Sequence, residues 1–286
     1  MRKKTVLVSG LLPYDSGKTW FTMSLFKTLI ATGARAVPYK PVAAHNIWYS
    51  IATVKHSARL KILVGNDAYA YFKETGESPA LLNPVALASA PLDPVNYGLD
   101  VEKYLEDSSL FLPQLVVARI AYYPSSQIEH FIIQENVEKT VPEAKRVVEL
   151  LRKKLRPVKI SLREISEMLQ SSRIDQIVVS ALSSLLEKYD VILLESFNDA
   201  VLPSMGLMEN IDQIIVVAPG RAFLYDANTT KNILRYLTEN LENPAYLVTS
   251  KLLPKFNPTN IANIPVMLKP GKHDKLRPIV DFILKE

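Results

Sequence analysis

The chain has 286 residues, 48% hydrophobic and 22% charged, which is the balance of an ordinary soluble globular protein long enough to bury its own core. It holds no cysteine, which excludes disulfides, thiolate catalysis and cysteine-bound metal sites and favours a cytoplasmic protein. Its net charge is +5, but the densest basic stretch, residues 145–156, alternates with apolar residues at helical spacing. We interpret that stretch as a solvated helix face, so nucleic acid is not an expected partner.

The start of the chain is not expected to be a targeting segment. Residues 2–4 are basic, as at the start of a signal peptide, but Ser9 and Gly10 interrupt the apolar stretch that follows. No run approaches the roughly twenty apolar residues of a membrane span. We therefore expect a soluble protein without a membrane partner.

The first hundred residues predict alternating strands and helices. Three apolar residues in a row, at 6–8, indicate a buried strand. Gly33 is expected to end the helix that follows, and Gly65 with Asn66 separates two later helices. Asn83 to Gly98 contains three prolines without a steady period and is predicted to be a long loop. The predicted strands here are residues 5–9 and 34–37.

Residues from about 100 to 175 show weaker patterns and are predicted to be an insertion. Strands are expected at 115–121 and 128–134. Thr140 to Glu143 and Ser161 to Glu164 both have the spacing of a capping box and predict helix starts.

The last third predicts strands that alternate with helices. The predicted strands are 191–194, 214–217, 246–248 and 265–268, and the predicted helices are 174–188, one through Ile233 and Leu237, and 276–284. This alternation predicts an α/β fold with a mostly parallel sheet flanked by helices. We expect one domain, 1–286, with an insertion at about 100–175.

The segment Gly10 to Thr19 carries the strongest functional pattern. It lies between a predicted strand and a predicted helix, where backbone N–H groups, including those of Asp15, Ser16 and Gly17, can surround an anion. In such a phosphate-binding loop, Lys18 reaches the β- and γ-phosphates and Thr19 ligates Mg²⁺. Six residues separate the two glycines here, whereas the usual spacing has four. The alternative is a chance Gly-Lys-Thr in a turn.

Four further segments carry recognisable patterns beyond the loop that ends in Gly-Lys-Thr: Tyr39–Ala44, Gly65–Tyr71, Leu82–Pro94 and Asp190–Ser196. Together with the loop they resemble dethiobiotin synthetase, a P-loop enzyme whose family includes cobyrinic acid a,c-diamide synthase. They follow the family's order along the chain and cover roughly residues 5–98 and 175–286.

The resemblance implies a set of site residues. Thr19, Asp67 and Glu195 would form a magnesium shell, which fits a cation that prefers oxygen ligands and keeps several waters. Glu195 closes a predicted strand, at the edge of an open α/β sheet where ligands bind. Lys18 would clamp the phosphates, and Lys40 would contact the substrate or its carbamate. The alternatives are a helix N-cap for Asp67 and a surface lysine in a proline-rich turn for Lys40.

Two segments depart from the family. Its glycine-rich continuation after the acidic residue is replaced by Ser196, Phe197, Asn198 and Asp199, which predicts a different substrate pocket. An asparagine that reads adenine in the family has no counterpart, and Thr249 or Ser250 is the candidate for that role. The guanine-reading aspartate of GTP-specific proteins is absent after this strand, so ATP is favoured, with GTP not excluded.

We therefore expect an ATP- and Mg²⁺-dependent enzyme that activates a small carboxylate or carbamate by phosphoryl transfer. Its partners would be a nucleoside triphosphate and a small-molecule acceptor, and the family's dimers favour a homodimer. One alternative is a regulatory ATPase or GTPase switch that acts through a partner bound at residues 100–175. Another is a kinase for a small metabolite or a polynucleotide.

Overall fold

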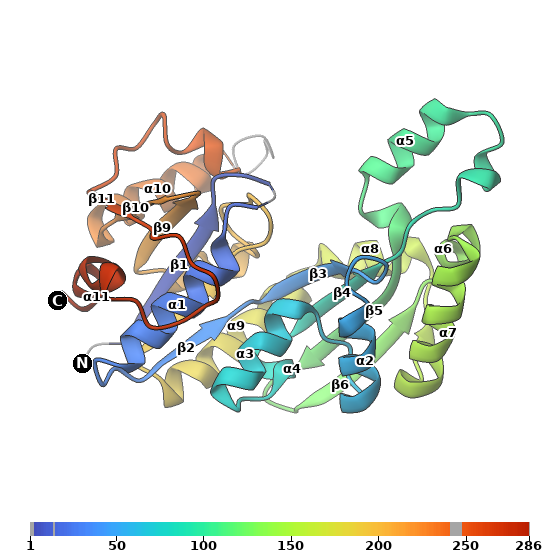
Figure 1. The fold of residues 1–286 in the computed structure, drawn as a ribbon, viewed down its shortest axis with the longest axis horizontal. Coiled ribbons are helices and arrows are strands. Elements are labelled where there is room, and N and C mark those ends of the chain that lie inside the picture. The colour runs from blue at the N-terminus through green and yellow to red at the C-terminus, as the bar shows by residue number, and fades with distance from the viewer. Residues whose placement is uncertain (1–2, 14, 241–247, 286) are drawn as a thin grey trace. The chain divides into compact units, whose positions relative to one another are not determined.

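The chain folds into two β-sheets, each flanked by helices (Figure 1). The computed structural model describes residues 3–13, 15–240 and 248–285. Residues 1–41 and 182–286 form the first compact unit, and residues 42–181 form the second. The α/β class is confirmed, and both sheets are mixed. The segment predicted to be an insertion, about 100–175, lies inside the second unit.

The first sheet has the strand order β11-β10-β9-β1-β8-β2. The strands β2, β8, β1 and β9 are parallel neighbours, while β10 runs antiparallel to both β9 and β11. Every residue of β1 and β8 is buried, as expected for strands covered on both faces. The strands are β1 (Lys4–Gly10), β2 (Ala36–Tyr39), β8 (Val191–Glu195), β9 (Gln213–Ala218), β10 (Arg221–Tyr225) and β11 (Asn260–Asn263).

Helices cover this sheet through their apolar faces. Helix α1 packs on β1, β2 and β8, and α10 packs on β9 and β10. Asp226 caps α10 by accepting a hydrogen bond from the Thr229 amide at 2.8 Å. The helices of this unit are α1 (Lys18–Ile30), α10 (Ala227–Glu239), α11 (Arg277–Leu284) and the end of α9 (Ser172–Lys188), with 3-10 turns η3 (Met205–Asn210), η5 (Thr249–Lys251) and η6 (Asp274–Leu276).

The second sheet has the strand order β3-β4-β5-β6-β7, with parallel outer pairs and antiparallel inner pairs. Its strands are β3 (Val42–Asn46), β4 (Val85–Ser89), β5 (Leu115–Tyr122), β6 (Gln127–Ile132) and β7 (Val158–Lys159). The helices of this unit are α2 (Ile51–Leu60), α3 (Asn66–Thr75), α4 (Pro79–Leu82), α5 (Val101–Ser109), α6 (Gln134–Lys139), α7 (Pro142–Leu155), α8 (Leu162–Leu169) and the start of α9, with 3-10 turns η1 (Pro94–Tyr97) and η2 (Leu112–Gln114).

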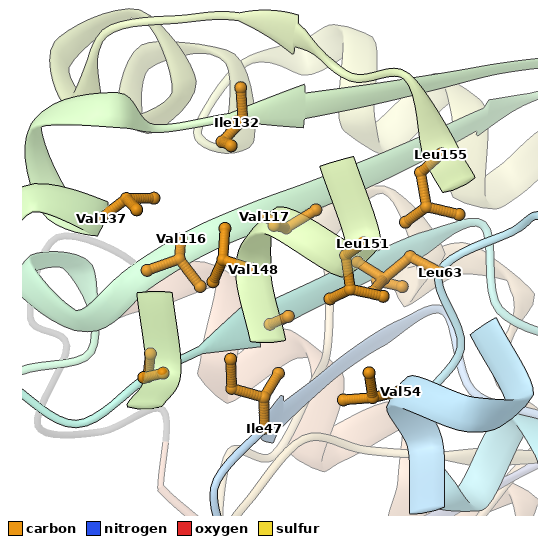
Figure 2. Packing of buried hydrophobic residues seen from close by; sticks show 14 residues of the cluster. Ile47, Val54, Leu63, Val116, Val117, Ile132, Val137, Val148, Leu151 and Leu155 are labelled. Carbon is orange, nitrogen blue, oxygen red and sulfur yellow. The ribbon is translucent and has the colours of Figure 1, made fainter. Parts of the chain in front are cut away.

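Helix α7 anchors the core of the second unit. Its buried residues recur every three or four positions, so Val148 and Leu151 point toward the sheet and lie over Val116 and Val117 of β5 (Figure 2). Basic residues occupy the other side of α7, which confirms the solvated helix face predicted for residues 145–156. Each large apolar side chain buried in this way contributes about 1.5–3 kcal/mol to stability.

Most predicted elements are confirmed. Strands are present near 5–9, 34–37, 115–121, 128–134, 191–194 and 214–217, and helices near 174–188, 233–237 and 276–284. The capping box of Ser161 and Glu164 is also confirmed at the start of α8. The predicted strand at 246–248 falls mostly on residues 241–247, which lie outside the described residues. In the described part of the chain, none of the helices combines the length and apolar character that a bilayer crossing requires.

Three predictions are wrong. The predicted loop from Asn83 to Gly98 contains β4, a buried strand whose small and apolar residues the prolines had masked. Residues 265–268 form no strand, because the chain instead pairs at 260–263 with β10. Thr140 does not cap α7, since its hydroxyl donates to the Val137 carbonyl, and the helix begins at Pro142.

A buried polar cluster interrupts the apolar core of the second unit. Arg119 on β5 is fully buried and lies opposite His130 on β6. Its guanidinium donates to the Asn83 backbone carbonyl and, at 3.0 Å, to the Asn83 side-chain oxygen. The Leu63 amide donates to His130 Nε2 at 3.1 Å, which requires that nitrogen to be unprotonated. Burial, and next the charge of Arg119, lowers the pKa of His130 to about 4.

The low pKa of His130 predicts a loss of stability in mild acid. An unfolded histidine titrates near 6.5. Between pH 6.5 and about 4 the unfolded state therefore binds a proton that the folded state does not. The free energy of unfolding should fall across this window by about 1–3 kcal/mol on account of His130 and should be unaffected by it above pH 7.

Urea unfolding at pH 4.5 and 7.5 checks this in a Trp20→Phe background, where Trp48 is the remaining tryptophan and reports the second unit. His130→Gln should flatten the pH dependence relative to the same background. An equal slope in both proteins would contradict the assignment.

Candidate functional site

The loop between β1 and α1 starts at Gly10 and leads directly into helix α1 at Lys18. The Leu11 amide donates to the Val217 carbonyl at 2.8 Å, which ties the start of the loop to β9. Asp15 and Gly17 have positive φ values of 54° and 80°. At Gly17 a side chain would meet no atom within 4 Å, so the described structure favours glycine there for its backbone conformation.

Gly10 keeps open the space that the Lys18 ammonium occupies. A Cβ at residue 10 would lie 2.6 Å from Lys18 Nζ and 2.5 Å from Ser16 Oγ, closer than real Cβ contacts allow. Lys18 Nζ donates to Ser16 Oγ at 3.1 Å, and Ser16 is buried. The Lys18 side chain therefore lies over the end of β1, where its ammonium faces the loop.

Glu195 is the centre of the polar contacts at this sheet edge. It ends β8 opposite Val8 of β1 and is fully buried. Its Oε1 accepts a hydrogen bond from Thr19 Oγ1 at 2.9 Å and from Lys40 Nζ at 2.8 Å. The three residues meet because β1, β8 and β2 are parallel neighbours that end at the same edge of the sheet.

Lys40 is also buried, so its contact with Glu195 is a buried ion pair. The alternative of a surface lysine is therefore wrong. A buried carboxylate needs a partner of opposite charge, because removal from water destabilises an isolated charge by several kcal/mol. Lys40 compensates the charge of Glu195 in this structure.

The donor set at this edge suits a hard divalent cation. A hydroxyl and one carboxylate from the chain leave room for phosphate oxygens and water, which is how Mg²⁺ is commonly held. Among the described residues there is no group of three or more His, Asp or Glu side chains that could hold a metal ion without such help. Thr19 and Glu195 therefore fit magnesium better than zinc.

Asp67 belongs to the second unit. It lies in the first turn of α3, where Gly65 is the N-cap and no side chain caps the helix. The alternative of an Asp67 N-cap is wrong, since the helix begins at Asn66, two residues earlier than that role requires. Burial lowers the pKa of His45, and the negative charge of Asp67 acts against that lowering. The part of Asp67 in a magnesium shell stays a prediction.

Hydrogen bonds fix the segment after β8. The Ser196 amide donates to the Val8 carbonyl at 2.9 Å, and its hydroxyl donates to the Ala200 carbonyl at 2.6 Å. The Thr249 hydroxyl donates to the Asp199 carbonyl at 2.9 Å. Thr249 thus holds this segment in place, while Ser250 is exposed. Base recognition by either residue stays a prediction.

A cavity of about 140 Å³ adjoins the loop and was not anticipated from the sequence. Its lining combines the start of α1 with the β9–β10 turn and the segment after β11. The Pro219-Gly220 pair after a buried strand was an available turn signal, because such a pair terminates strands and reverses the chain. The lining residues include Ser16, Gly17, Trp20, Pro219, Gly220 and Met267.

Comparisons with known proteins identify no relative of this chain. No protein-family model matches the chain, and no curated protein matches it. The functional argument therefore depends on the chain's own residues, and the resemblance to dethiobiotin synthetase stays a prediction.

The buried ion pair predicts strong energetic coupling between Lys40 and Glu195. Lys40→Met leaves the carboxylate without its buried ammonium and should lower the free energy of unfolding by about 3 kcal/mol. Adding Glu195→Gln removes the charge that Lys40 compensates, so the double variant should be less destabilised than the sum of the single variants. The expected coupling is at least about 1 kcal/mol.

Urea unfolding at pH 7 checks this in a Trp48→Phe background, where Trp20 is the remaining tryptophan and reports the first unit. Additive effects of the two substitutions would show that the contact contributes nothing of its own.

Proposed function

We propose that the first unit binds a magnesium nucleoside triphosphate in a P-loop formed by residues 10–19 and transfers its terminal phosphoryl group. The observation that carries this proposal is the 2.9 Å contact between Thr19 Oγ1 and Glu195 Oε1. It brings together the hydroxyl that follows the loop lysine and an acidic residue 176 positions later in the chain. A chance Gly-Lys-Thr in a turn has no reason to lie against a buried carboxylate on the neighbouring parallel strand.

Charge at the loop supports an anionic ligand. The helix α1 begins at Lys18, so its first amide groups and its positive dipole end face the loop. The Lys18 ammonium lies at the same place, beside Ser16. These groups would neutralise the phosphate oxygens and hold them for transfer. A bound Mg²⁺ supplies further neutralisation of the charge that develops on those oxygens.

Lys40 would bind the acceptor substrate. The proposed acceptor is a small carboxylate or carbamate, and its negative charge complements the ammonium that now pairs with Glu195. Phosphoryl transfer to such a group gives a mixed anhydride, which activates it for attack by an amine. In this reading the chain is a ligase similar to dethiobiotin synthetase, and ATP is the favoured nucleotide.

Because of the segment after β8, the reaction product must be identified separately from ATP turnover. Ser196 is fully buried where the family has glycine, so the surface beside the carboxylate differs from a dethiobiotin pocket. Ring closure of a diamino acid with CO₂ and ATP would identify the chain as a dethiobiotin synthetase. ATP turnover without that product would indicate another acceptor.

Gly10→Ala should weaken nucleotide binding without unfolding the chain. The new Cβ would take the space of the Lys18 ammonium and the Ser16 hydroxyl, which must then move away. Calorimetry with Mg·ATP and Mg·GTP should show binding to the wild type and a Kd raised at least about tenfold in the variant.

Gly271→Ala is the matched control, because a Cβ at that residue meets no atom within 4 Å, and it should bind as the wild type does. A folded wild type that gives no heat with either nucleotide would refute the proposal.

Lys18→Ala should lower the rate of nucleotide turnover at least roughly 10²-fold, as expected when one preorganised donor to the transferred group is lost. Phosphate release by purified protein measures this, and labelled γ-phosphate shows whether an acceptor other than water receives the group. Lys231→Ala, an exposed residue of α10, is the control and should leave turnover unchanged. Near-normal turnover in Lys18→Ala would count against the loop as the phosphate site.

A further inference from the structure

Residues 93–111, which we call the arm, extend from the second unit with their apolar side chains uncovered. Neither η1 nor α5 contains a buried residue. Val95, Leu99, Val101 and Leu105 are 80%, 99%, 62% and 59% exposed. Helix α5 packs against the flanking turns η1 and η2, and in the view of Figure 1 it lies above α6 and α7. Exposed apolar groups gathered on one segment are typical of an interaction surface.

The arm is nevertheless held in a defined conformation. Asp93 accepts a hydrogen bond from the Val95 amide at 3.0 Å, and Asp100 caps α5 by accepting one from the Lys103 amide at 2.9 Å. Tyr97 donates to Asp107 at 3.0 Å. These contacts order the arm locally, so it can dock with less loss of conformational freedom than a disordered segment.

The arm also carries an unusual charge. It contains five acidic residues and a single basic one, Lys103, in a chain whose overall charge is +5. On α5, Val101 and Leu105 lie one turn apart, as do Glu102 and Glu106 beside them. The helix thus offers an apolar stripe next to an acidic one, and its partner should offer the same pattern with basic charge.

The outer face of α7 has that pattern. Arg146, Leu150, Lys153 and Lys154 are exposed and recur at positions i, i+4, i+7 and i+8, so they share one side of the helix. Leu150, 45% exposed, is therefore surrounded by cations. Two acidic residues lie near this face: Glu143, one turn before Arg146, and Glu149, which pairs with Arg152 at 3.4 Å.

We propose that the arm binds the outer face of α7 in a second copy of this chain. Every copy carries both surfaces, so two such contacts can form reciprocally and close a twofold dimer. Leu105 and Val101 would cover Leu150, while Glu102 and Glu106 face Lys153 and Lys154. Because charge contributes to the contact, dimerisation weakens as salt concentration rises. This inference does not depend on nucleotide binding.

Complementary charge reversals test the proposal. One protein carries Glu102→Lys with Glu106→Lys, and the other carries Lys153→Glu with Lys154→Glu. All four side chains are exposed, so both proteins should fold. In sedimentation at micromolar concentration, the wild type should be a dimer, and each variant alone should dimerise at least about tenfold more weakly because its arm and α7 repel.

Mixing the two variants should restore the dimer, since one contact becomes basic arm on acidic helix and the other has the wild-type charges. Glu187→Lys with Glu239→Lys, on exposed residues of the first unit, makes the same charge change as the arm variant and should leave dimerisation intact.

Three results would overturn the proposal: a wild type that stays monomeric, dimers that survive in both variants, or variant monomers that do not pair on mixing. The last would mean that the arm binds another surface or another protein. Nucleotide binding measured on the same variants separates this outcome from a failure of the proposed function.

Discussion

The contact of Thr19 and Lys40 with the Glu195 carboxylate is the constraint on which the candidate site of the first unit depends. A single buried oxygen at the end of β8 joins the first turn of α1 to the residue that follows β2, and β1, β8 and β2 are parallel neighbours. Because Glu195 is fully buried, its charge must be compensated at all times. A ligand that draws Glu195 away from Lys40 must bring its own positive charge, and a magnesium ion bound to phosphate does so.

Much of this edge could be predicted from the sequence because local patterns determined it. Three apolar residues before Gly10 and the Gly-Lys-Thr at 17–19 predict the strand, loop and helix without knowledge of the rest of the chain. The position of Glu195 at the end of an apolar run also predicts its place at the same sheet edge. The partners of Glu195 required more, since Thr19 and Lys40 are 176 and 155 residues away from it.

The division into two units was not predictable by the same reasoning. Strand β4 is short and contains two alanines and a serine among its five residues, so it shows little of the β-branched pattern that identifies strands, and prolines flank it on both sides. Without β4, strand β3 loses the neighbour with which it pairs, and the remaining strands of the second sheet are interpreted as an insertion. The hairpin of β9 and β10 was missed for a related reason, since Arg221 to Tyr225 follows a turn and mixes charged, small and aromatic residues.

The connectivity of the two units has a consequence for biosynthesis. The second unit is continuous from Val42 to Ala181, whereas β1 pairs with β8 and β9, which the ribosome makes more than a hundred residues later. A nascent chain can therefore complete its second unit while β1, an apolar strand, still lacks both neighbours. Chaperones that shield apolar segments would act on the emerging chain during this interval, before translation reaches β8.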